Sequence, residues 1–302
     1  MASKIKKKKI NQRVIFYMCA VAWPIVQFFI FYVCVNFNSI LLSVRKLNYY
    51  TQSWEFAGIE NFESVLKDFS GQAYMMDAFK NTLTIFLISL VTMFIPIILA
   101  YYLFKKYPMH GMFKVFLFLP HIVSSMALVL CYKYFAEVAI PEIWKICFNK
   151  QISGLVYDYD TMWGTLLFYH IWVGMGGSFL LYLGAMSSIS DSVLEAAQLD
   201  GVNPIQEFLF IVFPMVYPTF ITFVVTSFAT LFTNQLNVFT FFGDKADYSV
   251  YTMGYLLYAK VRKASISDYP YYSALGLILT AFAIPLCFGT KWLLTKIGPK
   301  TE

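Results

Sequence analysis

The sequence predicts an all-α membrane protein with six transmembrane helices. Of the 302 residues, 59% are hydrophobic and only 13% are charged, a composition far from that of ordinary soluble proteins. The apolar residues also gather into separate runs of about 20 or more, the length that an α-helix needs to cross a bilayer. The chain is therefore expected to cross the membrane repeatedly.

The predicted spans form one transmembrane domain over residues 14–297, between a basic N-terminal segment, 1–13, and a short tail, 298–302. The spans are expected at residues 14–35, 81–104, 112–135, 163–187, 214–242 and 273–294.

The basic N-terminal segment sets the predicted orientation. It holds five lysines, Lys4 and Lys6 to Lys9, and ends on Arg13, directly before the first span. Because cytoplasmic segments carry the excess of Lys and Arg, the N terminus is expected in the cytoplasm. An even number of spans then places the C terminus there as well. The first apolar run is too long for a signal peptide and lacks its small-x-small cleavage site.

A polar stretch, residues 191–214, separates the fourth and fifth predicted spans. Ser192 and Glu195 fit an S-x-x-E capping box that opens a short helix. Gly201 is the natural residue to end that helix in a left-handed conformation. Asn203 and Pro204 then predict the start of a second helix, as its cap and first residue. The expected local structure is helix, turn, helix.

The charges of this stretch indicate a protein partner. Residues 191–213 contain Asp191, Glu195, Asp200 and Glu207 but no Lys or Arg. One interpretation is a pair of amphipathic helices lying in the membrane interface, but anionic lipid would repel these carboxylates. A partner with basic side chains fits them better.

The same stretch resembles the EAA loop of ABC importer permeases of the maltose type, whose pattern is E-A-A, three residues, G, nine residues, I, one residue, L, P. Phe213 replaces the leucine, and the other fixed positions are met by Glu195, Ala196, Ala197, Gly201, Ile211 and Pro214. In that family the loop lies in the cytoplasm and docks on the ATP-hydrolysing subunit. The resemblance therefore implies that these residues and Asp200 dock an ATPase, and that the fold is a type I ABC importer transmembrane domain.

The resemblance also implies a set of partners in a bacterial plasma (inner) membrane. They are a second homologous permease subunit, two ATP-binding subunits, an extracytoplasmic solute-binding protein and the surrounding membrane lipid, without nucleic acid. This chain has no P-loop motif G-x-x-x-x-G-K-[ST]. It is expected to bind no cofactor itself, with ATP and Mg on the ATPase subunits.

The start of the third predicted span, Phe118–Ser125, resembles the F-x-x-P-x-x-x-S stretch of the same family, with one residue fewer before the proline and one more between it and Ser125. The resemblance implies that His121 and Ser125 approach the transported solute. The alternative for His121 is a histidine hydrogen-bonded within the helix bundle.

The fourth predicted span carries His170, Trp172 and Gly174 and resembles the family's W-x-G element. An aromatic ring beside glycines offers a stacking face that a ligand can approach closely. Glycines also simply pack transmembrane helices, so that interpretation stays open. With few histidines and no clustered acids, a metal site is not expected.

The fifth predicted span holds polar residues in steps of three or four, which would place them on one helix face. Such a stripe suits a solute pathway or hydrogen bonds between helices. Its amides suit sugar hydroxyls and would be costly facing lipid. The pathway candidates here are Thr230, Asn234, Gln235 and Asn237. Trp172, Asn234, His121 and Ser125 are expected to face one shared cavity.

Together these features predict the transmembrane subunit of an ATP-driven, binding-protein-dependent importer, not an enzyme. No acid falls inside the predicted spans, so a proton-coupled or sodium-coupled transporter is disfavoured. No catalytic residues are expected, because no nucleophile and base share a span. A sugar or oligosaccharide is the favoured cargo. The alternatives are a polyol or glycerol-phosphate-like solute, or a membrane-embedded enzyme acting on lipid or glycan.

Overall fold

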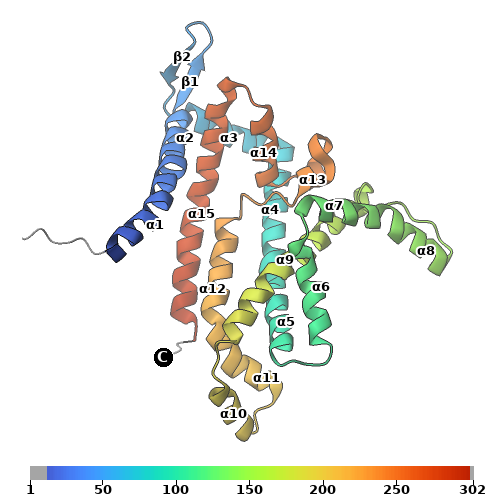
Figure 1. The fold of residues 1–302 in the computed structure, drawn as a ribbon. Coiled ribbons are helices and arrows are strands. Elements are labelled where there is room, and N and C mark those ends of the chain that lie inside the picture. The colour runs from blue at the N-terminus through green and yellow to red at the C-terminus, as the bar shows by residue number, and fades with distance from the viewer. Residues whose placement is uncertain (1–11, 300–302) are drawn as a thin grey trace, which may run out of the picture. The chain divides into compact units, whose positions relative to one another are not determined.

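The computed structural model describes residues 12–299, so most of the predicted N-terminal segment and tail lie outside the described residues. Within residues 12–299 the regular structure is helical except for one two-stranded hairpin, which confirms the predicted all-α class (Figure 1). The chain divides into two compact units. The first comprises Met1–Leu66 and Ala264–Ile278, and the second comprises Lys67–Lys263 and Leu279–Glu302.

The first unit contains a long apolar helix and a small hairpin. Its elements are α1 (Gln12–Phe28), the π-helix η1 (Phe29–Cys34), α2 (Val35–Ser43), β1 (Arg45–Asn48), β2 (Ser53–Phe56), the first part of α3 (Glu60–Gly71), η6 (Ile266–Asp268) and the start of α15 (Tyr269–Ile297).

The chain that leaves the hairpin is shaped by two residues that favour turns, Gly58 and Asn61. β1 and β2 pair antiparallel, with Arg45 opposite Phe56. Gly58 then adopts a φ of 58°, in the left-handed region that glycine tolerates best. The Asn61 amide donates hydrogen bonds of 2.8 and 2.9 Å to the carbonyl oxygens of Ser43 and Arg45. Gly58 and Asn61 therefore have a structural role in this segment.

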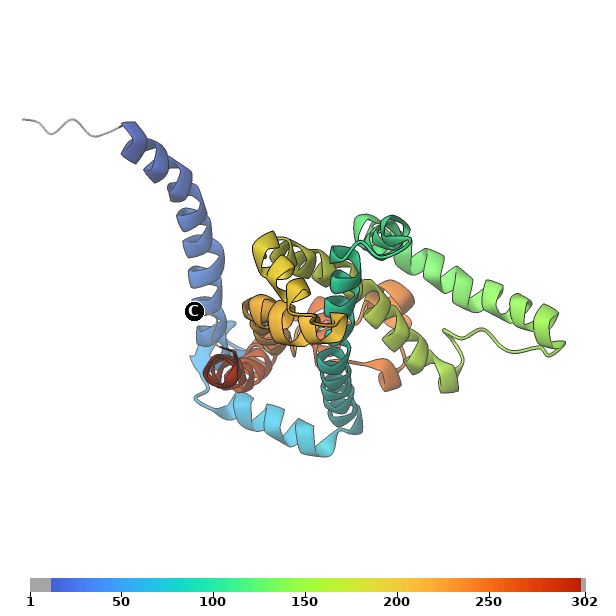
Figure 2. The same cartoon turned by 90° about the horizontal axis from the view of Figure 1, so that it is seen from below.

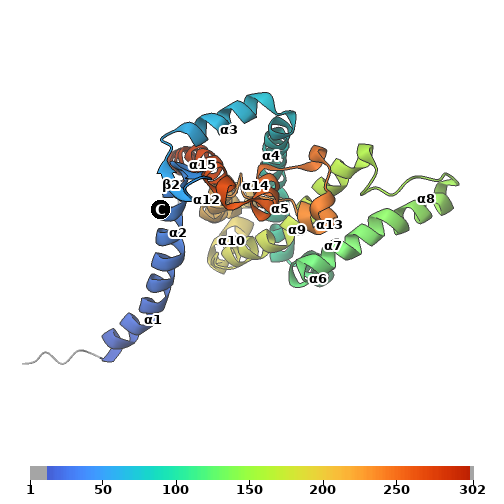
Figure 3. The same cartoon turned by 90° about the horizontal axis from the view of Figure 1, so that it is seen from above.

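The second unit contains most of the helices (Figures 1 and 3). Its elements are α4 (Ala73–Thr92), α5 (Phe94–Phe104), α6 (His110–Ile122), α7 (Ser125–Tyr134), η2 (Phe135–Ala139), α8 (Ile140–Phe148), α9 (Tyr159–Met186), α10 (Asp191–Leu199), α11 (Pro204–Glu207), η3 (Phe208–Val212), α12 (Phe213–Ala229), α13 (Val238–Phe242), η4 (Gly243–Lys245), η5 (Tyr248–Val250), α14 (Met253–Lys263) and the rest of α15.

Five helical segments of the described chain are long and apolar enough to cross a membrane. They are Phe16–Ser43, Ala73–Phe104, Tyr159–Met186, Pro204–Ala229 and Ile266–Ile297. A sixth crossing exists if α6 and the helix from Ser125 to Phe148 count as one bent span.

The third predicted span is not one continuous helix, and that prediction is wrong in detail. The chain turns by 109° between α6 and the helix that begins at Ser125. α6 has Pro120 in its last turn, where the ring removes a backbone donor. Val123 and Ser124 then have extended backbones, with ψ of 141° and 131°. These extended residues end the helix and redirect the chain.

The fifth predicted span, 214–242, is also shorter than expected, because α12 ends at Ala229. Residues 230–237 form turns, and Leu236 and Asn237 have positive φ values of 52° and 55°. The Asn234 side chain accepts a hydrogen bond of 2.9 Å from the Leu236 N–H. Such local side-chain bonds compete with a helix. The predicted polar stripe is therefore wrong beyond the end of α12.

The core of the second unit lies where α9 packs against α5 and α12. Phe179, Tyr182 and Met186 of α9 are fully buried there, together with Ile97 of α5 and Val216 of α12. On another side α9 approaches α6 through Gly176, where a Cβ atom would lie 2.8 Å from the carbonyl oxygen of Leu117. A small residue is therefore required at this contact.

Gly176→Ala should destabilise the second unit by about 1–3 kcal/mol, the usual cost of overpacking. Gly184→Ala on the same helix is the control, because a Cβ atom there meets nothing within 4 Å. Thermal unfolding of the two purified variants in detergent should show a lower midpoint for Gly176→Ala only. Equal midpoints would contradict the close α6–α9 contact.

Candidate functional site

The polar stretch between α9 and α12 folds as helix, turn, helix, as the sequence predicted. α10 ends in a Schellman motif, in which the Val202 N–H donates to Ala197 O and the Gly201 N–H donates to Gln198 O, both at 3.1 Å. Gly201 has a φ of 73°. The Asn203 side chain accepts from the backbone N–H of Gln206 at 2.9 Å, and the Gln206 side chain accepts from the Asn203 N–H at 3.2 Å. We call residues 191–214 the docking loop, after the role that the sequence predicts for them.

Two predicted details of the docking loop are wrong. The N-cap of α10 is Ser190 and not Ser192, and no side chain caps this helix. Glu195 therefore lies beyond the first turn, which contains Asp191 instead. Serines stand at both 190 and 192, so the spacing alone did not fix the start of α10.

The docking loop exposes most of the residues expected to dock a partner. Glu195, Ala196 and Asp200 are exposed, as is the neighbouring Asp191. Leu199 is 88% exposed, which leaves an apolar side chain among these carboxylates. Ala197 is buried, and Ile211 and Pro214 are half-buried. The loop therefore presents a mixed acidic and apolar surface.

Glu207 does not belong to this exposed acidic surface, contrary to the sequence-based expectation. It is 3% exposed and pairs with Lys105 at 3.0 Å. It also lies in the apolar segment Pro204–Ala229, where the sequence predicted no acid because the span was drawn from residue 214. An acid beside a long apolar run, with a lysine directly after the second predicted span, was the sequence signal for this pair.

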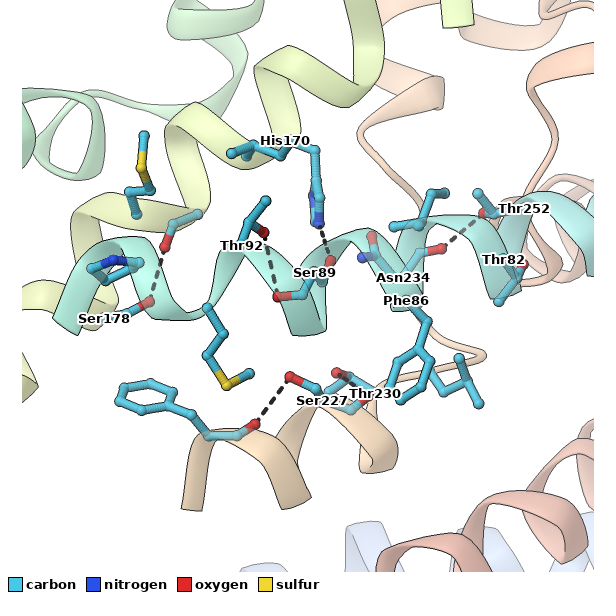
Figure 4. A pocket seen from close by; sticks show the side chains of 18 residues that line it. Thr82, Phe86, Ser89, Thr92, His170, Ser178, Ser227, Thr230, Asn234 and Thr252 are labelled. Atoms are coloured by element: carbon cyan, nitrogen blue, oxygen red, sulfur yellow. Dashed lines mark hydrogen bonds between the residues drawn. The ribbon is translucent and has the colours of Figure 1, made fainter. Parts of the chain in front are cut away.

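A cavity of about 220 Å³ lies between α4, α5, α9 and α12 (Figure 4). Ile85, Phe86, Pro96 and Phe223 form part of its apolar wall. No Asp, Glu, Lys or Arg lines it. Its polar lining consists of Thr82, Ser89, Thr92, His170, Ser178, Ser227, Thr230, Asn234 and Thr252.

The hydroxyl groups of the cavity donate mostly to the backbone. Ser178 donates to Gly174 O at 3.0 Å, Ser227 to Phe223 O at 3.0 Å, and Thr230 to Thr226 O at 2.9 Å. Across the cavity, Ser89 Oγ lies 3.2 Å from His170 Nε2 (Figure 4). A hydroxyl that donates to a carbonyl keeps lone pairs that can accept a further hydrogen bond. The cavity therefore presents mainly hydrogen-bond acceptors.

Four of the predicted pathway residues line this cavity, namely His170, Gly174, Thr230 and Asn234. The other five do not. Trp172 borders a separate hollow beside Pro120 and Leu128, and Gln235 borders an open groove beside Tyr258 and Arg262.

His121, Ser125 and Asn237 are also outside the cavity. The His121 ring lies against α9, where a Cβ atom at Gly177 would be 3.1 Å from His121 Cε1. The Ser125 hydroxyl donates to Asn237 Oδ1 at 3.4 Å. The expected shared cavity of Trp172, Asn234, His121 and Ser125 is therefore wrong in this structure, because the bend after α6 redirects the helix that begins at Ser125.

The sequence-based reasoning missed the hydroxyl groups of α4. Thr82, Ser89 and Thr92 line the cavity and are spaced by seven and three residues. That spacing puts them on one face of a helix. On α9, His170, Gly174 and Ser178 follow one another at intervals of four. Both patterns were visible in the sequence.

The cavity and the docking loop share the same two helices. α9 runs from the cavity down to Met186, and α12 returns from Phe213 to the cavity at Phe223 and Ser227. α10 and α11 lie at the end of the second unit opposite α13 and α14 (Figures 1 and 2). A displacement of the docking loop would therefore act on two of the cavity walls.

Comparison with known proteins bears on this arrangement. The family described as binding-protein-dependent transport system inner membrane component matches residues 92–302. This region includes the docking loop, α9 and α12, and hence most of the cavity.

Individual relatives share about a quarter of their aligned residues with this chain. The chain is 24% identical, over 85% of its length and 87% of the relative, to the multiple sugar-binding transport system permease protein MsmF of Streptococcus mutans. It is 25% identical, over 63% of both chains, to the sn-glycerol-3-phosphate transport system permease protein UgpA of Pectobacterium atrosepticum.

A solved structure shares the fold. A chain of the bacterial alginate ABC transporter, in complex with an alginate pentasaccharide-bound periplasmic protein, superposes with a TM-score of 0.77. The identity is 16%, and the match covers 94% of this chain and 96% of the other.

In a cysteine-free background, Ser227→Cys should react with a small methanethiosulfonate reagent, because this position faces the cavity. Val224→Cys is the control, one helical turn away and 7% exposed in the core. Mass spectrometry of the protein in detergent should find the label on Ser227→Cys and little on Val224→Cys. Equal labelling of both would contradict the cavity.

Proposed function

Because this chain belongs to the family of binding-protein-dependent transport system inner membrane components, we propose that it is the transmembrane subunit of an ATP-driven importer that carries a sugar or oligosaccharide. In this proposal ATP is hydrolysed on separate subunits. Their movement would act on the docking loop, and the helices around the cavity would alternate between outward and inward access.

One observation carries this proposal: an uncharged, hydroxyl-rich cavity lies on the same two helices that the docking loop joins. A mechanical input at the loop then has a direct route to a polar site inside an apolar helix bundle. The cavity of about 220 Å³ is below the roughly 300–1,000 Å³ of a typical ligand pocket. It is therefore suited to part of a saccharide, with a second permease subunit holding the remainder.

The hydrogen bonding of the cavity favours a neutral polyhydroxyl solute. Its serine and threonine hydroxyls donate to backbone carbonyls and leave acceptors facing the solute. Sugar hydroxyls can donate to such acceptors, whereas a phosphate or carboxylate requires donors. A glycerol-phosphate-like solute is the second candidate, supported by the relative UgpA. The absence of Lys and Arg from the lining disfavours it.

The proposed partners are two ATP-binding subunits, a second permease subunit and an extracytoplasmic solute-binding protein. The periplasmic protein bound in the alginate transporter structure supports the last of these. The exposed carboxylates of the docking loop support an ATPase with a basic groove. In this proposal the loop and both termini lie in the cytoplasm, where ATP is present.

Glu195→Lys should weaken docking of the ATP-binding subunits by about 2–5 kcal/mol, provided the contact is desolvated, because a charge pair is replaced by a repulsion. Gly201→Val should have the same effect through the backbone. No atom lies within 4 Å of a Cβ at this position, but its φ of 73° is strongly unfavourable for valine. The measurement is the amount of ATPase that co-purifies with the tagged permease.

Gly201→Asn is the matched control, since asparagine tolerates the left-handed conformation. It should keep near-normal docking, and all three variants should reach the membrane in normal amounts. Normal co-purification with both Glu195→Lys and Gly201→Val would refute the docking assignment.

Asn234→Ala should reduce uptake of a neutral oligosaccharide roughly two- to tenfold, the effect of one lost hydrogen bond. Gln235→Ala is the matched control, because this adjacent amide borders a different groove. Uptake is measured in cells with a panel of radiolabelled neutral sugars.

Unlabelled neutral sugars should compete in this assay, and sn-glycerol-3-phosphate should not. Competition by sn-glycerol-3-phosphate alone would favour the second candidate function. If Asn234→Ala and Gln235→Ala behave alike, the cavity is not the solute site.

A further inference from the structure

A largely buried ion pair connects the docking loop to the end of α5. The Lys105 ammonium lies 3.0 Å from Glu207 Oε1 and 3.1 Å from Oε2. The Tyr101 hydroxyl lies 3.2 Å from Glu207 Oε1 and 3.0 Å from the carbonyl oxygen of Pro204. The Lys105 and Glu207 side chains are only 19% and 4% exposed. Separating Lys105 from Glu207 would leave a buried charge without its partner, which is costly in free energy.

The contact joins two elements that are far apart in the sequence. Glu207 is the last residue of α11, which starts at Pro204 directly after the docking turn. Lys105 follows the last residue of α5. The rings of Tyr101 and Phe208 also pack, with centroids 5.1 Å apart. α11 lies beside the lower end of α5 in two views (Figures 1 and 2).

The other end of α5 reaches the cavity. Thr92 and Met93, at the junction of α4 and α5, and Pro96 in the first turn of α5 line it. α5 is a continuous helix of 11 residues between the cavity and Lys105. A movement of α11 would therefore reach a third cavity wall through side chains, in addition to the covalent route through α9 and α12.

We propose that Lys105, Tyr101 and Glu207 form a clamp that makes α5 follow the docking loop, so that ATPase movement changes the cavity wall at Met93 and Pro96. These are positioning residues that need not touch the solute. The clamp rests on the proposed function, because it transmits the movement that the ATP-binding subunits supply. The buried Glu207 acts inside the permease, whereas the exposed Glu195 faces the partner.

The test measures cavity movement directly. In the assembled complex with its ATP-binding subunits, Thr92→Cys at the α4–α5 junction, which lines the cavity, reports access to the α5 wall through its labelling rate with a methanethiosulfonate reagent. With the clamp intact, Mg-ATP should change this rate. In Glu207→Gln and Lys105→Met, the ATP-dependent change should fall at least about fivefold, the lower end of usual coupling between sites. The ATP-binding subunits should still co-purify.

The exchanged pair, Lys105→Glu with Glu207→Lys, should restore most of the ATP-dependent change. Lys106→Asn is the matched control. It removes a neighbouring exposed cation at a φ of 53°, which asparagine tolerates, and should leave the change intact. If the single variants do not assemble, Tyr101→Phe keeps the ion pair and should show a reduced change.

Three outcomes would overturn the clamp. The first is a normal ATP-dependent change in labelling rate in Glu207→Gln and Lys105→Met. The second is a loss of the ATP-binding subunits from these variants in proportion to their loss of that rate change. The third is a normal rate change in Tyr101→Phe together with no rescue by the exchanged pair. Failure of the proposed function gives a different result, since Mg-ATP would then leave the labelling rate unchanged even with the clamp intact.

Discussion

The packing of α9 against α5 and α12 is the contact on which the second unit depends. Lipid tails are as apolar as the side chains, so transmembrane helices associate through close packing more than through removal of apolar surface from water. Phe179, Tyr182 and Met186 are fully buried in this contact, and Gly176 lets α6 approach α9 from another side. This packing places the cavity near the middle of α9 and fixes the end of α9 from which the docking loop leaves.

The cavity hydroxyls and Glu207 form their hydrogen bonds in two different ways. Most cavity hydroxyls donate along their own helices, as Ser178 does to Gly174 O, whereas Ser89 pairs with His170 of α9. Glu207 instead takes its partners from α5 and the residue after it, Tyr101 and Lys105. An ionisable group in an apolar span is costly unless it is paired, and it commonly marks function. The first arrangement leaves acceptors for a solute, and the second ties two helices together.

The docking loop was predictable because its structure is local. Gly201 ends α10 with a positive φ, and Asn203, Pro204 and Gln206 open α11 through bonds within four residues. The start of α10 was misplaced because Ser190 and Ser192 both fit a cap and neither side chain caps the helix. Local rules therefore settled the motif but not its first residue.

By itself, the sequence determined that this is a helical membrane protein, where most of its long apolar helices lie, and that a helix–turn–helix loop interrupts them. Those features depend on composition, on apolar runs and on bonds between near neighbours. Only the tertiary structure decided which polar residues meet. The bend after Ile122 takes Ser125 away from the cavity, and the end of α12 at Ala229 separates Asn234 from Gln235. The pairing of Lys105 with Glu207 joins residues about a hundred positions apart, and no local pattern encodes the distance between them.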